Sequence, residues 1–176
     1  MGNVDDSNFP YWPEPEFVLD HLNLLKLTGV SHILSLVPFN HNDLELLAED
    51  REKSLFLYRF KPVKTKAFFV SQLQVANDWE TVKKIVMATD FDPFSAVVVE
   101  KSEVAKLGEA AMDREQPSQK DEKFEITWEI GNSEFERWRI TTTRPGYFIV
   151  ANSYYPGWHA WVNGEPVKIL KAYGLF

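Results

Sequence analysis

The residues that could do chemistry are few, and their types already exclude several classes of active site. The chain has no cysteine, which excludes disulfides, thiolate metal sites and cysteine nucleophiles. Its histidines lack the i,i+4 spacing of a zinc site, so metal binding would need long-range convergence with carboxylates. The four histidines are His21, His32, His41 and His159. We therefore expect neither a metal ion nor a cofactor.

Two aspartates stand close together in the segment Asp90-Phe91-Asp92-Pro93, where a helix should give way to a strand. Carboxylates at such junctions cap turns more often than they transfer protons, so we interpret Asp90 and Asp92 as structural residues. A glycoside hydrolase that uses this pair is the alternative. The sequence has neither the Gly-x-Ser-x-Gly elbow of a serine nucleophile nor a glycine loop for phosphate, so no catalytic constellation is visible.

An aromatic cluster near the end of the sequence has the greatest potential to bind a ligand. Its members are Tyr154, Tyr155, Trp158, His159 and Trp161. Flat aromatic faces beside polar groups can hold sugar rings, although aromatic residues of a β-sheet also commonly fill a core. If Trp158 faces inward, strand alternation turns Trp161 outward, which makes Trp161 the best candidate for an exposed stacking surface. An interface with a membrane-embedded region or with lipid headgroups is a further interpretation of such an indole.

The elements that must position these residues begin with a half of mixed helix and strand signals. Pro15 can open a helix that Gly29 ends, and Asn77 with Glu80 has the spacing of a capping box. The expected helices are 13–29, 42–49 and 77–89, and the expected strands are 30–37, 55–60, 67–75 and 96–100.

Residues 124–176 have a different composition and a period of two. The apolar residues that alternate with polar ones at its start are Phe124, Ile126, Trp128 and Ile130. Residues 147–151 are continuously apolar and should form a central strand, and Asn163-Gly164 suits a type I′ hairpin turn. The predicted fold class is therefore α+β, with a mixed segment followed by an antiparallel β-meander that resembles a β-sandwich.

The domain boundary is expected at residues 101–123, which carry eleven charged side chains and are typical of a solvated linker or loop. We expect an α+β subdomain over 1–100 and an antiparallel β-sandwich region over 124–176, forming either two units or one compact unit. The net charge of −7 argues against a nucleic-acid partner. No apolar run reaches the about 18 residues that a membrane span needs, and the acidic first residues do not form a signal peptide.

One segment resembles a known family. It reads Tyr154-Tyr155-Pro156-Gly157-Trp158 and continues as His159-Ala160-Trp161-Val162-Asn163-Gly164. This segment resembles the membrane-distal C-terminal region of the bacterial YfhO-like family of multi-pass membrane proteins, in which such a stretch precedes an Asp-Gly or Asn-Gly hairpin. Residues 171–176 fit the part that follows in that family, and similarity in the family's order runs upstream to Lys64.

The resemblance implies a glycosyltransferase of the multi-pass C type, which takes sugar from a lipid-phosphate donor and holds its hydrophilic C-terminal domain outside the cytoplasm. The family's catalytic acids lie in earlier membrane-proximal loops and have no counterpart here, and relatives continue beyond the position of Phe176. We therefore expect an excised, non-catalytic accessory domain at the extracytoplasmic face of the cell membrane. Its partners would be the membrane-embedded part of its parent protein and a glycan or cell-envelope polymer. The alternative is a structural or protein-interaction β-sandwich without a small-molecule ligand.

Overall fold

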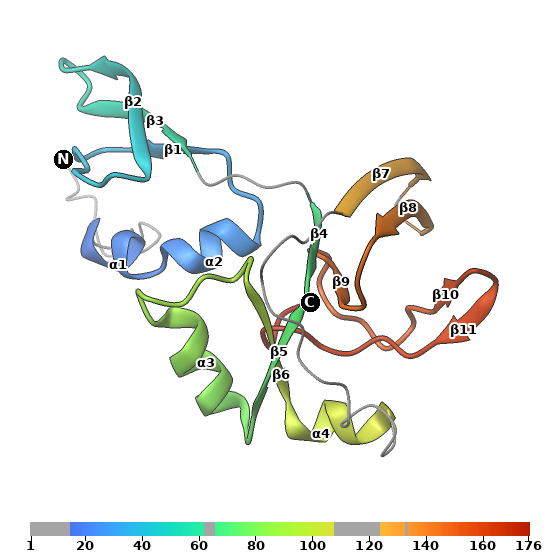
Figure 1. Cartoon of the computed structure of the whole chain (residues 1–176). Coiled ribbons are helices and arrows are strands. Elements are labelled where there is room, and N and C mark those ends of the chain that lie inside the picture. Colours follow the sequence, from blue (N-terminus) through green and yellow to red (C-terminus); the bar gives the residue numbers. More distant parts are fainter. Residues whose placement is uncertain (1–14, 62–65, 108–123, 133) are drawn as a thin grey trace, which may run out of the picture.

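The computed structural model describes residues 15–61, 66–107, 124–132 and 134–176, and it confirms a mixed α+β fold (Figure 1). The helices are α1 (Pro15–Asp20), α2 (Leu22–Leu27), α3 (Trp79–Met87) and α4 (Lys101–Val104), with a 3-10 turn over Ala105–Leu107. The earlier strands are β1 (His32–Ser35), β2 (Leu44–Asp50), β3 (Leu55–Phe60), β4 (Ala67–Val70), β5 (Gln72–Ala76) and β6 (Ala96–Glu100). The later strands are β7 (Phe124–Gly131), β8 (Glu136–Thr142), β9 (Tyr147–Val150), β10 (Ala160–Val162) and β11 (Glu165–Val167).

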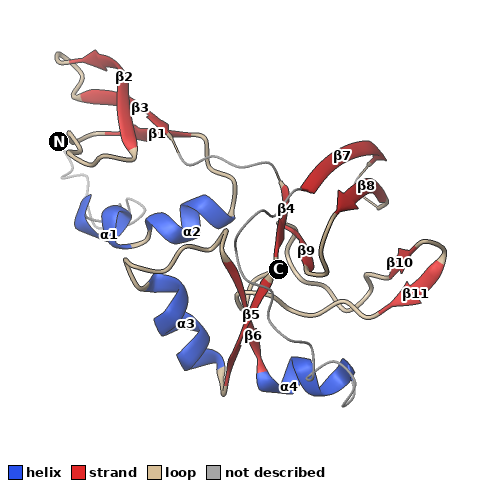
Figure 2. Ribbon diagram, in the orientation of Figure 1, coloured by secondary structure: helices blue, strands red, loops and turns tan. Residues whose placement is uncertain are grey.

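Helices α1 and α2 pack against a three-stranded antiparallel sheet in the order β1-β3-β2 (Figure 2). The small core between them consists of Leu22, Leu44, Tyr58 and Phe60. The helix predicted over 13–29 is present within the described residues but is divided at His21, whose ring nitrogen Nδ1 lies 2.6 Å from the carbonyl oxygen of Phe17. The strand predicted over 30–37 is confirmed as β1.

A βαβ unit forms the main core. Strands β5 and β6 run parallel, and α3 connects them. The helix begins at the N-cap Asp78, whose carboxylate accepts a 2.8 Å hydrogen bond from the backbone nitrogen of Thr81. The cap is therefore Asp78 and not the predicted Asn77. Val82 and Val86 of α3 are buried against the apolar run of β6, which confirms the buried strand predicted at 96–100.

The antiparallel pair β4–β9 has apolar contacts on both faces. One face places Phe68 and Ile149 in the main core. On the other face, the ring of Phe69 lies 5.9 Å from that of Phe124 in β7, and the ring of Phe148 lies 6.0 Å from that of Trp138 in β8. Two-sided contact explains why both strands are continuously apolar, but the central strand predicted over 147–151 is wrong, since β9 belongs to a sheet of only two strands, β4 and β9.

The end of the chain closes the main core. Tyr173 is buried, and its hydroxyl lies 2.7 Å from the carbonyl oxygen of Pro93 and 3.1 Å from that of Ala96. Ala172 forms a bridge with Val99 of β6. Segments from 66–100 and from 147–176 thus share one core. The predicted linker falls on α4 and the 3-10 turn up to residue 107, and residues 108–123 lie outside the described residues.

Several predictions about the helices and strands need correction. Residues 42–49 are not a helix, because β2 pairs along β3 with a bulge at Leu47. The strand predicted over 67–75 is divided into β4 and β5 at Ser71. The expected meander is wrong, since β9 pairs with β4 and not with β8. A β-sandwich is not confirmed, and Trp128 and Ile130, which alternation would bury, are 54% and 55% exposed.

Candidate functional site

The predicted binding residues occupy the β10–β11 hairpin and the turn before it. The hairpin turn is confirmed, because Asn163 and Gly164 have φ angles of 53° and 88°, the two positive values of a type I′ turn. Trp161 projects from β10 with 63% of its surface exposed. The ring of His159, also exposed, lies 6.2 Å from the Trp161 ring. Trp161 is therefore on the surface, but strand alternation is not the reason, because Val162, expected to face inward, is 57% exposed as well.

The two tyrosines of the cluster have different environments. Tyr155 is 67% exposed, and the backbone nitrogen of Trp158 donates a 3.1 Å hydrogen bond to its carbonyl oxygen across the turn. A Cβ atom at Gly157 would lie 2.9 Å from Cε1 of Tyr155, so glycine lets this ring lie over the turn. Tyr154 is half-buried, and its backbone nitrogen donates to the carbonyl oxygen of Leu175 at 3.0 Å.

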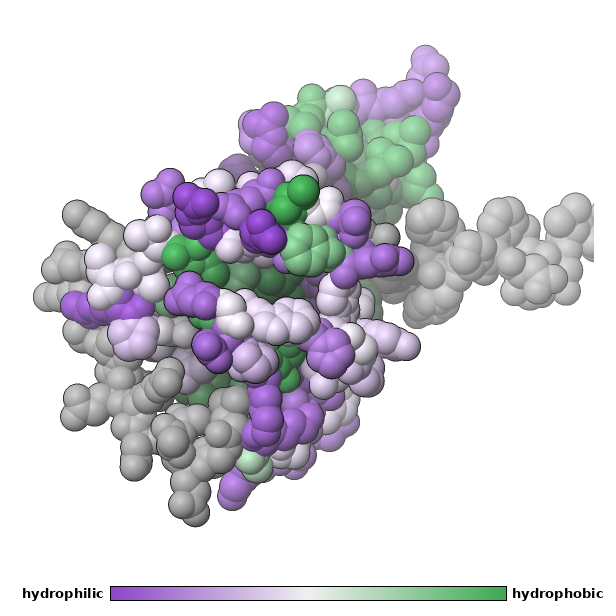
Figure 3. All heavy atoms as spheres, turned by 90° about the vertical axis from the view of Figure 1, so that its right-hand side faces the viewer, coloured by the Kyte–Doolittle hydropathy of each residue, from purple (hydrophilic) through white to green (hydrophobic). Residues whose placement is uncertain are grey.

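Trp158 lines a groove that the sequence alone did not indicate. We define this tryptophan groove by the residues that line its two adjoining cavities. They are Lys66, Trp128, Gly131, Asn132, Glu136, Trp138, Asn152, Ser153 and Trp158. Figure 3 shows the molecule from the side on which the β7–β8 and β10–β11 hairpins lie, where purple and near-white residues predominate and green ones are scattered among them. Of the predicted cluster, only Trp158 lines the groove, and Tyr154, Tyr155, His159 and Trp161 do not.

Strand pairing positions the tryptophans of the groove. Trp128 and Trp138 are directly paired across β7 and β8, and the register then shifts between Trp128 and Ile130. Asn132 organises the turn that follows, because its Oδ1 accepts hydrogen bonds from the backbone nitrogens of Glu134 and Phe135, at 2.8 and 3.0 Å. The bulge and the turn bring the end of the hairpin toward β4 and β9.

Glu136 at the start of β8 is the centre of the groove's polar network. Its carboxylate forms an ion pair with Lys66 and accepts hydrogen bonds from Asn152 Nδ2 at 3.4 Å and from Trp138 Nε1 at 3.2 Å. Burial raises the pKa of Glu136, but the hydrogen bonds from Lys66, Asn152 and Trp138 outweigh it, and the pKa lies below its ordinary value. Glu136 is therefore a carboxylate at neutral pH and acts as a hydrogen-bond acceptor, not as a proton donor.

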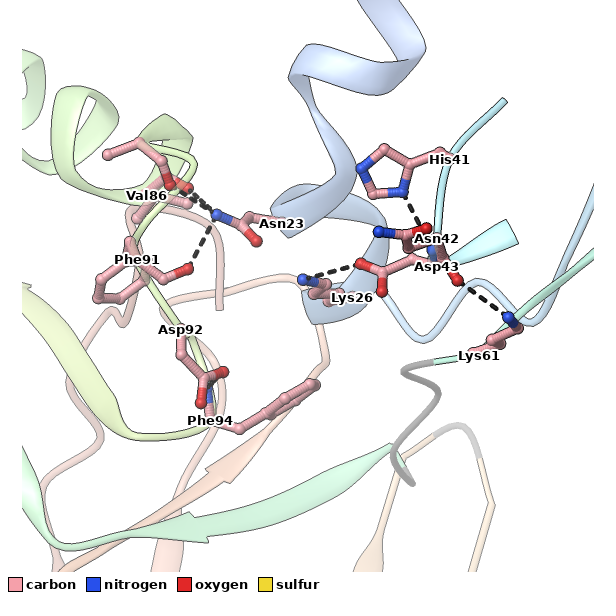
Figure 4. Close-up of polar contacts among 11 residues, drawn as sticks. Asn23, Lys26, His41, Asn42, Asp43, Lys61, Val86, Phe91, Asp92 and Phe94 are labelled. Atoms are coloured by element: carbon pink, nitrogen blue, oxygen red, sulfur yellow. Dashed lines mark hydrogen bonds and ion pairs between the residues drawn. The ribbon is translucent and has the colours of Figure 1, made fainter. Parts of the chain in front are cut away.

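Two other polar groups, Asn23 and Asp92, have structural roles. Asn23 of α2 is buried and its Nδ2 lies 2.9 Å from the carbonyl oxygen of Ala88 and 3.0 Å from that of Phe91, which ties α2 to the end of α3 (Figure 4). Asp92, predicted to be structural, accepts a 3.0 Å hydrogen bond from the backbone nitrogen of Phe94. Across the described ranges, no group of three or more His, Asp and Glu side chains could hold a metal ion.

The sequence indicated the aromatic residues around the β10–β11 hairpin as candidates, but of the residues that line the groove it indicated only Trp158. Lys66, Glu136 and Asn152 are far apart along the chain, and only the pairing of β4 with β9 and the docking of β7 and β8 bring them together. The helices of the described part of the chain include none that is long and apolar enough to cross a membrane. Comparison of the chain with protein-family models, with curated proteins and with solved structures finds no match.

Proposed function

We propose that the chain is the extracytoplasmic accessory domain of a YfhO-like membrane protein of the glycosyltransferase C type, and that it positions a glycan or acceptor without catalysing transfer. The support for the family is the resemblance of residues 154–167. The observation that carries the glycan role is the 63% exposure of Trp161 on the β10–β11 hairpin, beside His159 and close in sequence to Tyr155. An exposed indole held by a tight turn gives a sugar ring a preformed stacking face.

The finer fold belongs to the same proposal. We infer that the β4–β9 and β7–β8 ladders are the two layers of a small β-sandwich, supported by the ring contacts of Phe69 with Phe124 and of Phe148 with Trp138. Such a scaffold would hold the β10–β11 hairpin away from the main core and present it to a polymer. The partner that anchors the domain is then the membrane-embedded part of its parent protein.

The test is native electrophoresis of the chain in gels that contain dextran, mannan or solubilised cell-wall polysaccharide. A polysaccharide that the chain binds retains the chain, so that it migrates more slowly than in a gel without polysaccharide. Trp161→Ala should weaken retention about ten-fold, the effect of losing ~1.4 kcal/mol at a binding hot spot. Val162→Ala is the matched control, because Val162 neighbours Trp161 and is 57% exposed. The thermal unfolding of both variants should match that of the parent chain. Equal retention of Trp161→Ala and the parent chain would contradict the glycan role.

The alternative is a structural or protein-interaction domain with no small-molecule ligand. The observation in its favour is a set of exposed leucines on and beside the first sheet: Leu34 is 67% exposed, Leu36 52% and Leu46 48%. Under this alternative, no polysaccharide is retained, and replacement of Leu34 and Leu36 by serine abolishes capture of the parent protein's membrane region in pull-downs.

A further inference from the structure

We propose that the tryptophan groove binds a single uncharged pyranose ring, at a site separate from the Trp161 surface. The choice of sugar as the ligand class rests on the proposed function. The location of the site and its preference for an uncharged ring come from the groove's own residues.

The groove is a shallow recess at the lower size limit of small-ligand sites. Its two adjoining cavities measure about 310 and 300 Å³ and share Lys66, Asn132 and Glu136. Small-molecule sites begin at roughly 300 Å³. Because the two share these residues and are open to solvent, they form one shallow recess, with room for a single small ring between Trp128 and Trp158.

The indoles give the groove both apolar faces and hydrogen-bond donors. Trp138 is fixed by its hydrogen bond to Glu136, whereas Trp128 and Trp158 have no partner for their indole N–H among the described residues. Trp128 is 54% exposed, and Trp158 is half-buried in the opposite part of the groove. Each can present its ring face to the C–H side of a sugar and its N–H to a hydroxyl group.

The polar groups match hydroxyl groups, which both donate and accept. The carboxylate of Glu136 offers about four lone-pair positions, and three side chains donate to it, namely Lys66, Asn152 and Trp138. Lys66 is about half exposed and directs one ammonium proton to Glu136, so it can donate others to a ligand. A hydroxyl can therefore donate to Glu136 while a neighbouring hydroxyl accepts from Lys66.

The charges of the groove favour a ligand without charge. Lys66 and Glu136 are the only charged side chains among the described residues that line the groove, and they neutralise each other. A phosphate or uronate would meet the Glu136 carboxylate, and an amino sugar would meet the Lys66 ammonium. Either ligand has to compete with an existing ion pair, whereas an uncharged ring adds hydrogen bonds to it.

The test resolves the six indole N–H signals of the 15N-labelled chain by NMR, assigned through single Trp→Phe variants. The uncharged probes are the methyl glycosides of glucose, galactose and mannose, and the charged probes are glucuronate and glucosamine. At least one uncharged probe should shift the signals of Trp128 and Trp158, whether or not it also shifts that of Trp161. Glucuronate should shift neither signal.

Glu136→Gln is the decisive variant, because it removes the negative charge and leaves Lys66 unpaired. The uncharged probe should bind about ten-fold more weakly, as expected when a hydrogen bond to a charged acceptor is lost. Glucuronate should now bind and shift both groove signals. Glu165→Gln, an exposed residue of β11 outside the groove, is the control and should change neither affinity. If Glu136→Gln does not fold, Trp158→Phe tests the stacking instead: followed by the Trp128 signal, the uncharged probe should bind more weakly, and glucuronate should still not bind because the Lys66–Glu136 ion pair is intact.

Three results would overturn the inference, and each is separate from the fate of the proposed function. Shifts confined to Trp161 would place sugar on the hairpin alone and leave the proposed function standing. An unchanged charge preference in Glu136→Gln would show that the ion pair does not select the ligand. If no uncharged probe shifts a groove signal, the groove is not a sugar site, and polymer retention through Trp161 still decides the proposed function.

Discussion

Replacing Gly174 by alanine should destabilise the protein more than the same change at Gly29 or Gly164, the other described glycines with a positive φ. Gly174 has a φ of +70°, and a Cβ atom there would lie 1.8 Å from Cζ3 and 2.5 Å from Cε3 of Trp79. Neither distance can be tolerated, so the indole at the start of α3 must move or the tail must leave the core. The tail carries Tyr173, one of the most deeply buried large side chains.

The magnitude follows from two separable costs. A left-handed backbone costs about 1–2 kcal/mol for a residue with a Cβ, and overpacking adds about 1–3 kcal/mol, which together give about 2–5 kcal/mol. Gly29 is the matched control, because its φ is +71° and no atom lies within 4 Å of a Cβ built there. Gly29→Ala should therefore cost only the backbone part, about 1–2 kcal/mol.

The assay is equilibrium unfolding in urea, with the midpoint and the slope compared among the variants. Trp79→Ala in the Gly174→Ala background should recover part of the loss, since the colliding ring is gone, and the double variant should lose less than the sum of the two singles. Equal losses for Gly29→Ala and Gly174→Ala, with additive effects of Trp79→Ala, would refute the packing of the tail against α3.

Two further predictions concern single polar groups. Tyr173→Phe should lower the free energy of unfolding by about 1–3 kcal/mol, because the buried carbonyl oxygens of Pro93 and Ala96 lose their donor; an unchanged urea midpoint would contradict this. Burial raises the pKa of the Tyr173 hydroxyl, which keeps it protonated as a donor. The pKa of Glu136 is lowered on folding from its ordinary value of 4.5, so its stabilisation should be complete above pH 4.5 and be lost as pH falls through the folded pKa. Urea midpoints of Glu136→Gln should then fall less steeply on acidification than those of the parent chain.

Structural features that depend on a few neighbouring residues were predicted well from the sequence. The Asn163-Gly164 hairpin is an example, because its two positive φ values are a local property of these residue types. The β-branched run of β6 also forms the buried strand that was expected. The cap of α3 was misplaced by one residue, since Asn77 and Asp78 both suit an N-cap and only the backbone geometry selects Asp78.

Structural features that depend on pairing with distant segments of the chain were not predicted. Residues 44–49 consist of leucine, glutamate and alanine, which favour a helix locally, yet they form β2 because β3 offers a full set of backbone partners. The apolar run at 147–150 was expected to be central, but the sequence could not show that its partner is β4. Strand pairing is chosen by packing over the whole chain, which local propensity does not contain.

The sequence by itself determined the α+β class and the Asn163-Gly164 hairpin turn, and it named Trp161 as the candidate for an exposed surface. Only the tertiary structure decided that Trp158 belongs to a groove with Trp128 and Trp138, and that Lys66 forms an ion pair with Glu136. These residues come from segments that are far apart along the chain, and each segment alone resembles an ordinary strand end. They gather because β4–β9 must cover apolar side chains on both faces, and the β7–β8 hairpin that covers the second face brings Glu136 to Lys66.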